Sequence, residues 1–528
     1  MRLKISYLSL EGAMEAVAFS AVPASESPFH SSFEKFQSLT KRLSLPQTRA
    51  MTHSDLEKML SEDGRELLRQ LFQDHLKLRG RGDLGKSVTG SDELERAEKR
   101  DRERGLTSVF GEVRVERTGY CARGGSSLFP KDSLLNLPED SFSHGVRRLV
   151  AVEAARGSFD ETLEAVQRVT GVELGKRQAE ELARKAARDF YAFYDEGCSE
   201  QALAAVKALP LQILSVDSKG IVMRHEDLKE ATRLKAETTE HKLSKRVSRG
   251  EKRNAKRMAT VAALYSIDEF VRRPEQVAGE FAPAQTAGLP QRPRPAAKRV
   301  WASLEKEQDQ VIEDLIQAAL ERDPKKRKRW VGLVDGDRKQ IRRLKGAAKK
   351  QDIQMTLVLD IVHVIEYLWK SARAFHEETS PQAQAWVSER LLEILRGNSS
   401  HVAAGMRRSA TLRGLSGEQR KPVDTCAGYL LNNKAYLRYD AYLRDGLPIA
   451  TGVIEGACRH LIKDRMDVTG ARWSLEGAEA ILKLRSLRSS GDFEAYWDFH
   501  ERQEYMRNHH SHYAKPSVLN KLKLTRVK

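Results

Sequence analysis

The sequence has 528 residues, too many for one hydrophobic core, and its length predicts about two to four domains. Lysine and arginine outnumber aspartate and glutamate by 91 to 74, and the net charge of +17 is spread along the chain, which indicates a polyanionic partner. No run approaches the roughly 18 to 20 apolar residues of a membrane-spanning helix, so nucleic acid is favoured over a membrane as that partner.

Two features predict a cytoplasmic protein. Near the N-terminus, basic residues precede apolar ones, but Glu11 and Glu15 interrupt what would be the apolar part of a signal peptide. The four cysteines lie far apart in the sequence, so they form neither a paired zinc-ligand spacing nor a dense disulfide framework. Reduced thiols in a cytoplasmic compartment fit this pattern.

The N-terminal region mixes irregular and periodic segments. Residues 1–45 show no sustained periodicity and residues 80–104 are crowded with charge and glycine, so we expect flexible connections in both. Between them, residues 54–78 place apolar side chains at helical intervals behind Ser54, which predicts an amphipathic helix with that serine as its N-cap. Apolar and polar side chains alternate over Val109–Val115 ahead of a turn-rich stretch, which predicts a short β-hairpin.

A helical pattern runs from Ser143 to Tyr194, with breaks at 157–158 and 170–171, and predicts three helices. The last two have the arrangement of a helix-turn-helix, in which the later helix would enter the major groove, with basic side chains on phosphates and Gln178 at a base edge. An ordinary three-helix bundle with a solvated basic face explains the pattern equally well. The basic residues of the later helix are Lys176, Arg177, Arg184, Lys185 and Arg188.

Beyond Pro210 the composition changes to short apolar runs separated by helical patterns, which indicates an α/β core. We expect two strands that meet near Asp217 and Gly220, a basic stretch from Lys242 to Arg257, and a buried strand. A proline-rich surface connection and a helix from Trp301 follow. The last two strands are predicted over the runs RWVGLVD and QMTLVLD, each of which ends on an aspartate.

The segment from Ile361 to about Arg444 is helical in pattern throughout. Four tyrosines recur in its last part. We interpret them as helix packing in preference to base stacking. They are Tyr429, Tyr436, Tyr439 and Tyr442.

Three carboxylates form the candidate catalytic group. Asp217 and Asp335 each end an apolar run, and the ends of strands are where α/β sheets assemble their sites. Two such aspartates are weak evidence alone, because aspartate is also common in turns and helix caps. Glu455 lies in a later helical segment among cationic residues. Carboxylates that converge from two strands and a helix would bind two Mg²⁺ ions through hard oxygen ligands, and a basic surface would hold a phosphodiester backbone.

At these residues the sequence resembles the DDE transposases of bacterial insertion sequences, specifically the ISKra-type group, and more distantly the Mutator-like transposases. The resemblance covers most of the chain in one order. The most specific segments are SVDSKGIVMR, VDGDRKQI, DIVHVIEYLW and GVIEGACRHLIKDRMDVTGARW, and FGEVRVERTGYC, LFPKDSLLNLP and SFDETLEAVQRVTG support it in the N-terminal part.

The resemblance implies a ribonuclease-H-like α/β core with a helical insertion before the last carboxylate, preceded by a mainly helical N-terminal DNA-binding region. Asp217 would lie on the first strand, Asp335 after the fourth and Glu455 on a late helix, and together they would be the catalytic residues that bind Mg²⁺ or Mn²⁺, as two ions. Asp337 competes with Asp335 for the second position, and Asp335 is preferred because it directly follows the apolar run. Ser218 stands where many relatives have glycine.

Two further pairs of residues have alternative interpretations. Asp360 and His363 match the D/C-x-x-H motif of Mutator-like transposases, where His363 would position DNA or support the metal site, or would be a packed histidine at a strand-to-helix junction. Arg472 could bind a phosphate and Trp473 could stack on an unpaired base, although a buried tryptophan is as well supported.

The family also implies function, partners and location. We expect a transposase that cleaves and joins DNA at the ends of an insertion sequence, with the element's terminal inverted repeats and target DNA as partners, acting as a homo-oligomer on DNA in the bacterial cytoplasm at the nucleoid. The alternatives are a structure-specific nuclease of the same fold and a non-catalytic DNA-binding protein derived from a transposase. The expected domains are an N-terminal helical and flexible region (1–105), a small β-hairpin region (106–142), a helix-turn-helix-like DNA-binding domain (143–200), the first part of the core (201–363), a helical insertion (364–445), and the last part of the core with a C-terminal tail (446–528).

Overall fold

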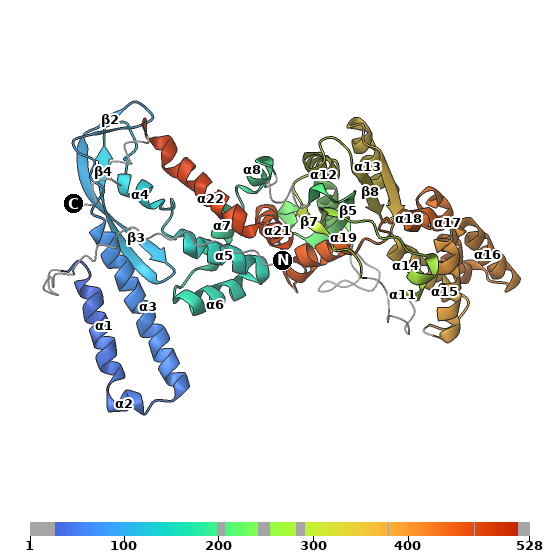
Figure 1. Cartoon of the computed structure of the whole chain (residues 1–528), viewed down its shortest axis with the longest axis horizontal. Helices are drawn as coiled ribbons and strands as arrows, with labels where there is room; N and C mark the ends of the chain where they lie inside the picture. The colour runs from blue at the N-terminus through green and yellow to red at the C-terminus, as the bar shows by residue number, and fades with distance from the viewer. Residues whose placement is uncertain are drawn as a thin grey trace, which may run out of the picture. The chain divides into compact units, whose positions relative to one another are not determined.

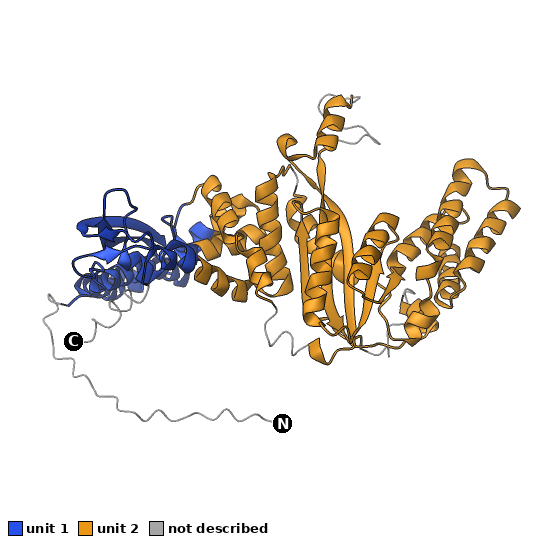
Figure 2. Cartoon of the chain, turned by 90° about the horizontal axis from the view of Figure 1, so that it is seen from above, with its two compact units in different colours: residues 1–146, 166–173, 504–528 blue, residues 147–165, 174–503 orange. Residues whose placement is uncertain are grey.

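The computed structural model describes residues 27–197, 206–240, 254–280, 291–378, 380–468 and 470–515. Cys198, most of the basic stretch 242–257 and most of the proline-rich connection lie outside these residues. The chain divides into two compact units (Figure 2), one made of Met1–Val146, Val166–Glu173 and Glu504–Lys528 and the other of Arg147–Ala165 and Leu174–Gln503. Within the described ranges, no helix is both long and apolar enough to cross a bilayer.

Helices begin the first unit: α1 (His30–Leu43), α2 (Pro46–Arg49) and α3 (His53–Leu78), with α4 (Pro130–Leu135) later in the chain. The expectation of a flexible connection up to residue 45 is wrong for α1, because buried Ser32 donates to Asp74 on α3 from both its backbone N–H and its hydroxyl. The amphipathic helix α3 is confirmed, but its N-cap is Thr52, whose hydroxyl accepts from the backbone N–H of Asp55, and not Ser54.

An antiparallel hairpin completes the first unit. Its strands are β3 (Glu98–Ser108) and β4 (Gly111–Cys121), preceded by the short pair β1 (Val88–Thr89) and β2 (Glu95–Arg96). The expected hairpin is present, but Val109 lies in its turn and the flexible connection expected over 80–104 is wrong for β2 and β3. The first residues of β3 are charged and exposed on both faces, so the sequence shows no alternation there. Full-length pairing with β4 and the Arg81–Asp101 ion pair order the strand instead.

A five-stranded mixed sheet forms the centre of the second unit (Figure 1). Its spatial order is β7-β6-β5-β8-β9; β6 pairs antiparallel with β5 and β7, whereas β8 pairs parallel with β5 and β9. Strands β8 and β9 and the central residues of β5 and β6 are mostly apolar and buried, because both faces of the sheet are covered there. The bounds of the five strands are β5 (Leu211–Val222), β6 (Lys256–Ile267), β7 (Ala296–Ser303), β8 (Arg329–Val334) and β9 (Met355–Leu359).

Two details of the sheet differ from the sequence-based expectation. Residues 211–222 form one long strand and not two, because β6 pairs with β5 over its whole length. The helix expected from Trp301 begins only at Gln308, and Trp301 belongs to the end of strand β7, which the sequence did not predict. Lys298 and Arg299 interrupt the apolar run of β7, and the Arg299 guanidinium is accommodated 3.6 Å from the ring centroid of Tyr194.

Helices pack on the sheet of the second unit. Helix α12 packs against β5 and β6, α13 against β8, and α21 against β7. Buried Glu479 on α21 accepts hydrogen bonds from the hydroxyl of Ser303 and the backbone N–H of Leu304, each at 2.8 Å, and so anchors the end of β7. The bounds of these helices are α12 (Gln308–Arg322), α13 (Arg338–Lys350) and α21 (Leu475–Ser490). Helices α10 (Glu230–Thr238), α11 (Pro274–Glu280) and α14 (Ile361–Ala372) also belong to this unit, and α22 (Phe493–Asn508) begins in it and ends in residues of the first unit.

The helical pattern from residue 361 to 444 is confirmed by α14 to α18 (Figure 1). Tyr439 and Tyr442 are buried and donate to the backbone carbonyls of Leu359 and Leu357 on β9, so they pack this helical block against the sheet as expected. The remaining bounds are α15 (Pro381–Leu395), α16 (Ser399–Leu412), α17 (Gly417–Asn432) and α18 (Tyr439–Arg444).

The three helices expected between residues 143 and 194 are present as α5 (His144–Arg156), α6 (Phe159–Thr170) and α7 (Lys176–Ala186), with α7 followed after a break by a separate helix α8 (Phe190–Asp195). Helix α7 packs against α21, and its Ala183 belongs to the same hydrophobic core as the five-stranded sheet. A fragment that ends near residue 197 would therefore expose this apolar face.

Candidate metal centre

Strands β5 and β8 bring the first two candidate carboxylates to the same level of the sheet. Their parallel pairing ends at Ser215 and Leu333. Asp217 lies two residues after Ser215, and Asp335 lies two residues after Leu333. The two aspartates therefore follow the paired segment in the same register. Asp217 lies within the long strand β5 and not at its end, because β5 continues beyond β8 in its pairing with β6.

Asp335 lies in a carboxylate-rich setting. Burial raises its pKa above the ordinary value, and the negative charge of Asp217 raises it further, against a hydrogen bond from the backbone N–H of Asp337. The hydroxyl of Tyr429 donates to the backbone carbonyl of Asp335 and fixes this loop. By contrast, the Asp337 carboxylate caps helix α13, where it accepts from the backbone N–H groups of Lys339 and Gln340.

Asp360 is fully buried at the start of α14 and organises the other half of the centre. It accepts from Nδ1 of His363 at 2.8 Å, from the backbone N–H of Thr451 at 3.1 Å and from the Thr451 hydroxyl at 2.6 Å. Burial acts to raise the pKa of Asp360, but these hydrogen bonds outweigh it and the pKa lies below its ordinary value. The hydrogen bond between His363 and Asp360 raises the pKa of His363 to about 8.

Glu455 lies on α19 (Gly452–Ala457), which packs against β5 and β6. The Thr451 hydroxyl lies 3.3 Å from Oε1 of Glu455, so Thr451 joins this carboxylate to Asp360. Burial and the negative charge of Asp360 raise the pKa of Glu455. A π-helical turn (Cys458–Lys463) and the short helix α20 (Asp464–Met466) follow, and such irregular turns are frequent at functional sites.

Cys458 is a member of this centre that sequence reasoning missed. Its thiol donates to Oδ2 of Asp217 at 3.1 Å, and burial followed by the charge of Asp217 raises the pKa of the thiol well above its ordinary value. It stays a neutral donor at physiological pH. Its position three residues after Glu455, on the same helix face, is the signal that could have pointed to it.

The ligand atoms of Asp360, His363 and Glu455 lie within 4.8 Å of one another. In the part of the chain that the structure describes, Asp217 and Asp335 do not join a group of that tightness, although the charges of Asp217 and His363 both act on Asp335. The ligand atoms of these five side chains suit a hard divalent cation such as Mg²⁺ or Mn²⁺, because all of them except the His363 nitrogen are carboxylate oxygens. A cation would also relieve the repulsion that raises the pKa values of Asp335 and Glu455.

The predicted DNA-binding residues fall on two segments of the second unit. On α7, Arg177 and Gln178 are exposed; Gln178 Oε1 accepts from the backbone N–H of Gly175 and caps the helix start. Arg184 and Lys185 of the same helix form ion pairs with Glu476 at 3.1 Å and Glu181 at 3.3 Å, respectively.

After Glu455, Arg472 is exposed, whereas Trp473 is buried and its indole N–H donates to the carbonyl of Met466. The alternative of a buried tryptophan is therefore what the structure shows.

No protein-family model matches the chain, and no curated protein matches it. Among solved structures, a match is found to the "Drosophila P element transposase strand transfer complex", with a TM-score of 0.22, 8% identity and coverage of 71% of this chain and 83% of that chain. A likeness at this level does not establish a shared fold or reaction.

Proposed function

We propose that the protein is a DDE transposase of the ISKra type, with a ribonuclease-H-like core that cleaves DNA and joins strands at the ends of an insertion sequence. The observation that carries the proposal is the common level of Asp217 and Asp335 on β5 and β8, with Glu455 on a helix packed on the same strand. The sheet supports it: in order of appearance along the chain, its five strands lie as 3-2-1-4-5, with the first three antiparallel. This is the arrangement expected of a ribonuclease-H-like core.

In this proposal Asp217, Asp335 and Glu455 hold two Mg²⁺ or Mn²⁺ ions, which would activate a water or a DNA 3′-hydroxyl and stabilise the leaving oxygen. Asp360 positions Glu455 through Thr451 and holds His363, so both act as positioning residues. The neutral thiol of Cys458 orients Asp217. The capping role of Asp337 supports Asp335 as the second ligand, because the Asp337 oxygen is already engaged by α13.

The exposed surface of α7 is the proposed DNA contact. Arg177, Arg184 and Lys185 would hold phosphates and Gln178 would approach a base edge, with Arg472 as a further phosphate contact. The net charge of +17 supports a DNA partner, and the protein would act on the element's inverted repeats and on target DNA as a homo-oligomer.

Metal dependence tests the proposed chemistry. With DNA segments that flank the encoding gene as substrate, we expect cleavage with Mg²⁺ or Mn²⁺ and little with Ca²⁺, since Ca²⁺ prefers longer bonds and looser geometry. DNA binding, measured in parallel by a gel-shift assay, should persist with Ca²⁺ because the cationic surface provides it. Full cleavage in excess chelator would refute the metal mechanism.

A pair of substitutions at Gln178 separates base reading from helix capping. Gln178→Ala removes both the cap and the amide donors, whereas Gln178→Glu keeps the accepting oxygen that meets Gly175 and replaces the donors by a negative charge, which weakens binding to all DNA sequences alike. If Gln178 reads a base, both variants lose about 1 to 3 kcal/mol of preference for the terminal sequence over random DNA, measured by competition binding. If Gln178→Glu keeps the wild-type preference, the residue only caps α7.

A further inference from the structure

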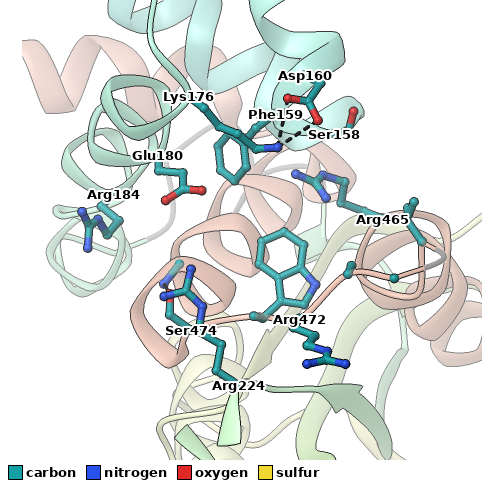
Figure 3. A pocket seen from close by; sticks show the side chains of 15 residues that line it. Ser158, Phe159, Asp160, Lys176, Glu180, Arg184, Arg224, Arg465, Arg472 and Ser474 are labelled. Carbon is teal, nitrogen blue, oxygen red and sulfur yellow. Dashed lines mark hydrogen bonds and ion pairs between the residues drawn. The ribbon is translucent and has the colours of Figure 1, made fainter. Parts of the chain in front are cut away.

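A cavity of about 480 Å³ lies in the second unit (Figure 3), and none of the candidate metal ligands lines it. It is enclosed by the beginnings of α6, α7 and α21, by the segment before α21, and by the residues that follow β5. Arg224 at the cavity lies seven positions after Asp217, and at about 3.3 Å per residue the chain between them spans roughly 23 Å. The cavity is therefore distinct from the metal centre.

The lining is cationic. Five cationic side chains face two carboxylates, Asp160 and Glu180. Lys176 is paired with Asp160 at 2.8 Å and Arg184 with Glu476 at 3.1 Å. The other three cations have no carboxylate within ion-pair distance among the described residues. They are Arg224, Arg465 and Arg472.

Arg465 is the informative member, because it is only 3% exposed and no carboxylate among the described residues lies within ion-pair distance of it, although the more distant charge of Glu161 acts on it. Its Nε donates to the carbonyl of Ala154, and its guanidinium lies 4.7 Å from the ring centroid of Trp473 and 5.5 Å from that of Phe159. One of its terminal nitrogens has no hydrogen-bond partner. Burial lowers the pKa of Arg465 to about 10, so it still carries its charge at neutral pH. A buried cation without a direct ion pair is costly, and an anion in the pocket would give it one.

Three helix N-termini add positive potential at the same place. Ser474 caps α21 and Ser158 precedes α6, and both line the cavity together with Lys176, the first residue of α7. The hydroxyl of Ser474 accepts from the backbone N–H of Gly477. The partial positive charge at each N-terminus favours a bound anion, as at phosphate sites in general.

We propose that this pocket binds one nucleotide of single-stranded DNA, with its phosphate on Arg465, Arg472 and Arg224 and its base against Phe159. The volume lies in the range of small-molecule pockets and exceeds what a phosphate alone would fill. Apolar side chains, including Val468 and Ala471, supply the wall for the base or sugar. The choice of DNA as the source of the nucleotide rests on the proposed function. The pocket would hold an unpaired nucleotide of the substrate strand away from the point of cleavage.

The test measures binding of a fluorescein-labelled single-stranded dT pentanucleotide to the full chain at about 0.15 M salt, where weak contacts of surface charge are screened. The double variant Arg224→Gln/Arg472→Gln removes two exposed pocket cations. Arg408→Gln/Lys434→Gln removes two exposed cations of the helical block and serves as the matched control. We expect the pocket variant to bind at least about tenfold more weakly and the control to stay within about twofold.

Further measurements decide the ligand and the role of Arg465. Arg465→Met keeps much of the side-chain volume, and we expect it to lose pentanucleotide binding with little change in melting temperature, because removal of a buried charge without an ion pair offsets the lost hydrogen bond to the Ala154 carbonyl. A lower melting temperature with unchanged binding would assign Arg465 a structural role and overturn the proposal. Equal loss in pocket and control variants would do the same. Displacement of the pentanucleotide by dTMP or inorganic phosphate at equal concentration would overturn DNA as the source.

The two proposals fail separately. If the pocket variants lose pentanucleotide binding but the wild-type protein shows no metal-dependent cleavage, the nucleotide-binding pocket is supported and the proposed transposase function is rejected. Metal-dependent cleavage with unaffected pentanucleotide binding would reject the pocket alone.

Discussion

We expect Asp335→Asn to abolish DNA cleavage in a protein that still folds and binds DNA. The loss should exceed about a hundredfold, since removal of a partner that merely supports a metal ligand already costs about 10- to 100-fold. Because burial and the charge of Asp217 raise the pKa of Asp335, a neutral asparagine relieves repulsion. We therefore expect an unchanged or slightly higher melting temperature. Asp217→Ala and Glu455→Ala should lose cleavage in the same way.

The structure provides a matched control two residues away. Asp337→Asn weakens the cap of α13 and should cost at most about 1 kcal/mol of stability while cleavage persists. Cleavage rates on gene-flanking DNA, thermal melting and gel shifts measure the three quantities. Cleavage by two of the three carboxylate variants, or loss of cleavage in Asp337→Asn with retention in Asp335→Asn, would reject the assignment.

Asp360→Ala should produce the largest loss of stability. The substitution leaves the buried backbone N–H of Thr451 without its acceptor, removes the shorter of the two contacts of the Thr451 hydroxyl, and removes the partner of His363. We expect a cost of about 3 kcal/mol in the free energy of unfolding, measured by denaturant titration. Cleavage should fall as well, because Asp360 no longer fixes the position of Thr451 beside the Glu455 carboxylate.

Asp360→Asn separates the two effects. Asparagine keeps an oxygen for the backbone N–H groups of Val362 and Thr451, so stability should fall by about 1 kcal/mol or less, and the pKa of His363 should drop from about 8 towards its ordinary value. That pKa can be followed by NMR of the imidazole. If the pKa of His363 is unchanged in Asp360→Asn, the hydrogen bond between Asp360 and His363 is not what raises that pKa.

The parts of the fold that the sequence could predict are those where burial leaves an uninterrupted pattern. Strands β8 and β9 are apolar runs that end before Asp335 and Asp360, and α3 is a long amphipathic helix. Strand β7 was not predicted, because Arg299 interrupts its apolar pattern. In the structure, Arg299 packs on the ring of Tyr194, which is distant in sequence, and on that of Trp301.

Individual residues of the candidate site could be predicted from the sequence, but the contacts between them could not. The acidic residues could be named, because their positions follow apolar runs or a family motif. The spacing of Cys458 from Glu455 points to its helix face, but its hydrogen bond to Asp217 and the burial of Arg465 against Ala154 could not be predicted, since both depend on packing between segments hundreds of residues apart.

The most direct test of a metal held by these carboxylates is a change of metal specificity in Asp335→Cys. Thiolate ligands bind Mg²⁺ poorly and accept softer Mn²⁺ more readily. With gene-flanking DNA as donor and a supercoiled plasmid as target, wild-type protein should cleave and join strands in either metal, whereas Asp335→Cys should be inactive in Mg²⁺ and regain both steps in Mn²⁺. Equal activity of Asp335→Cys in both metals would contradict the account.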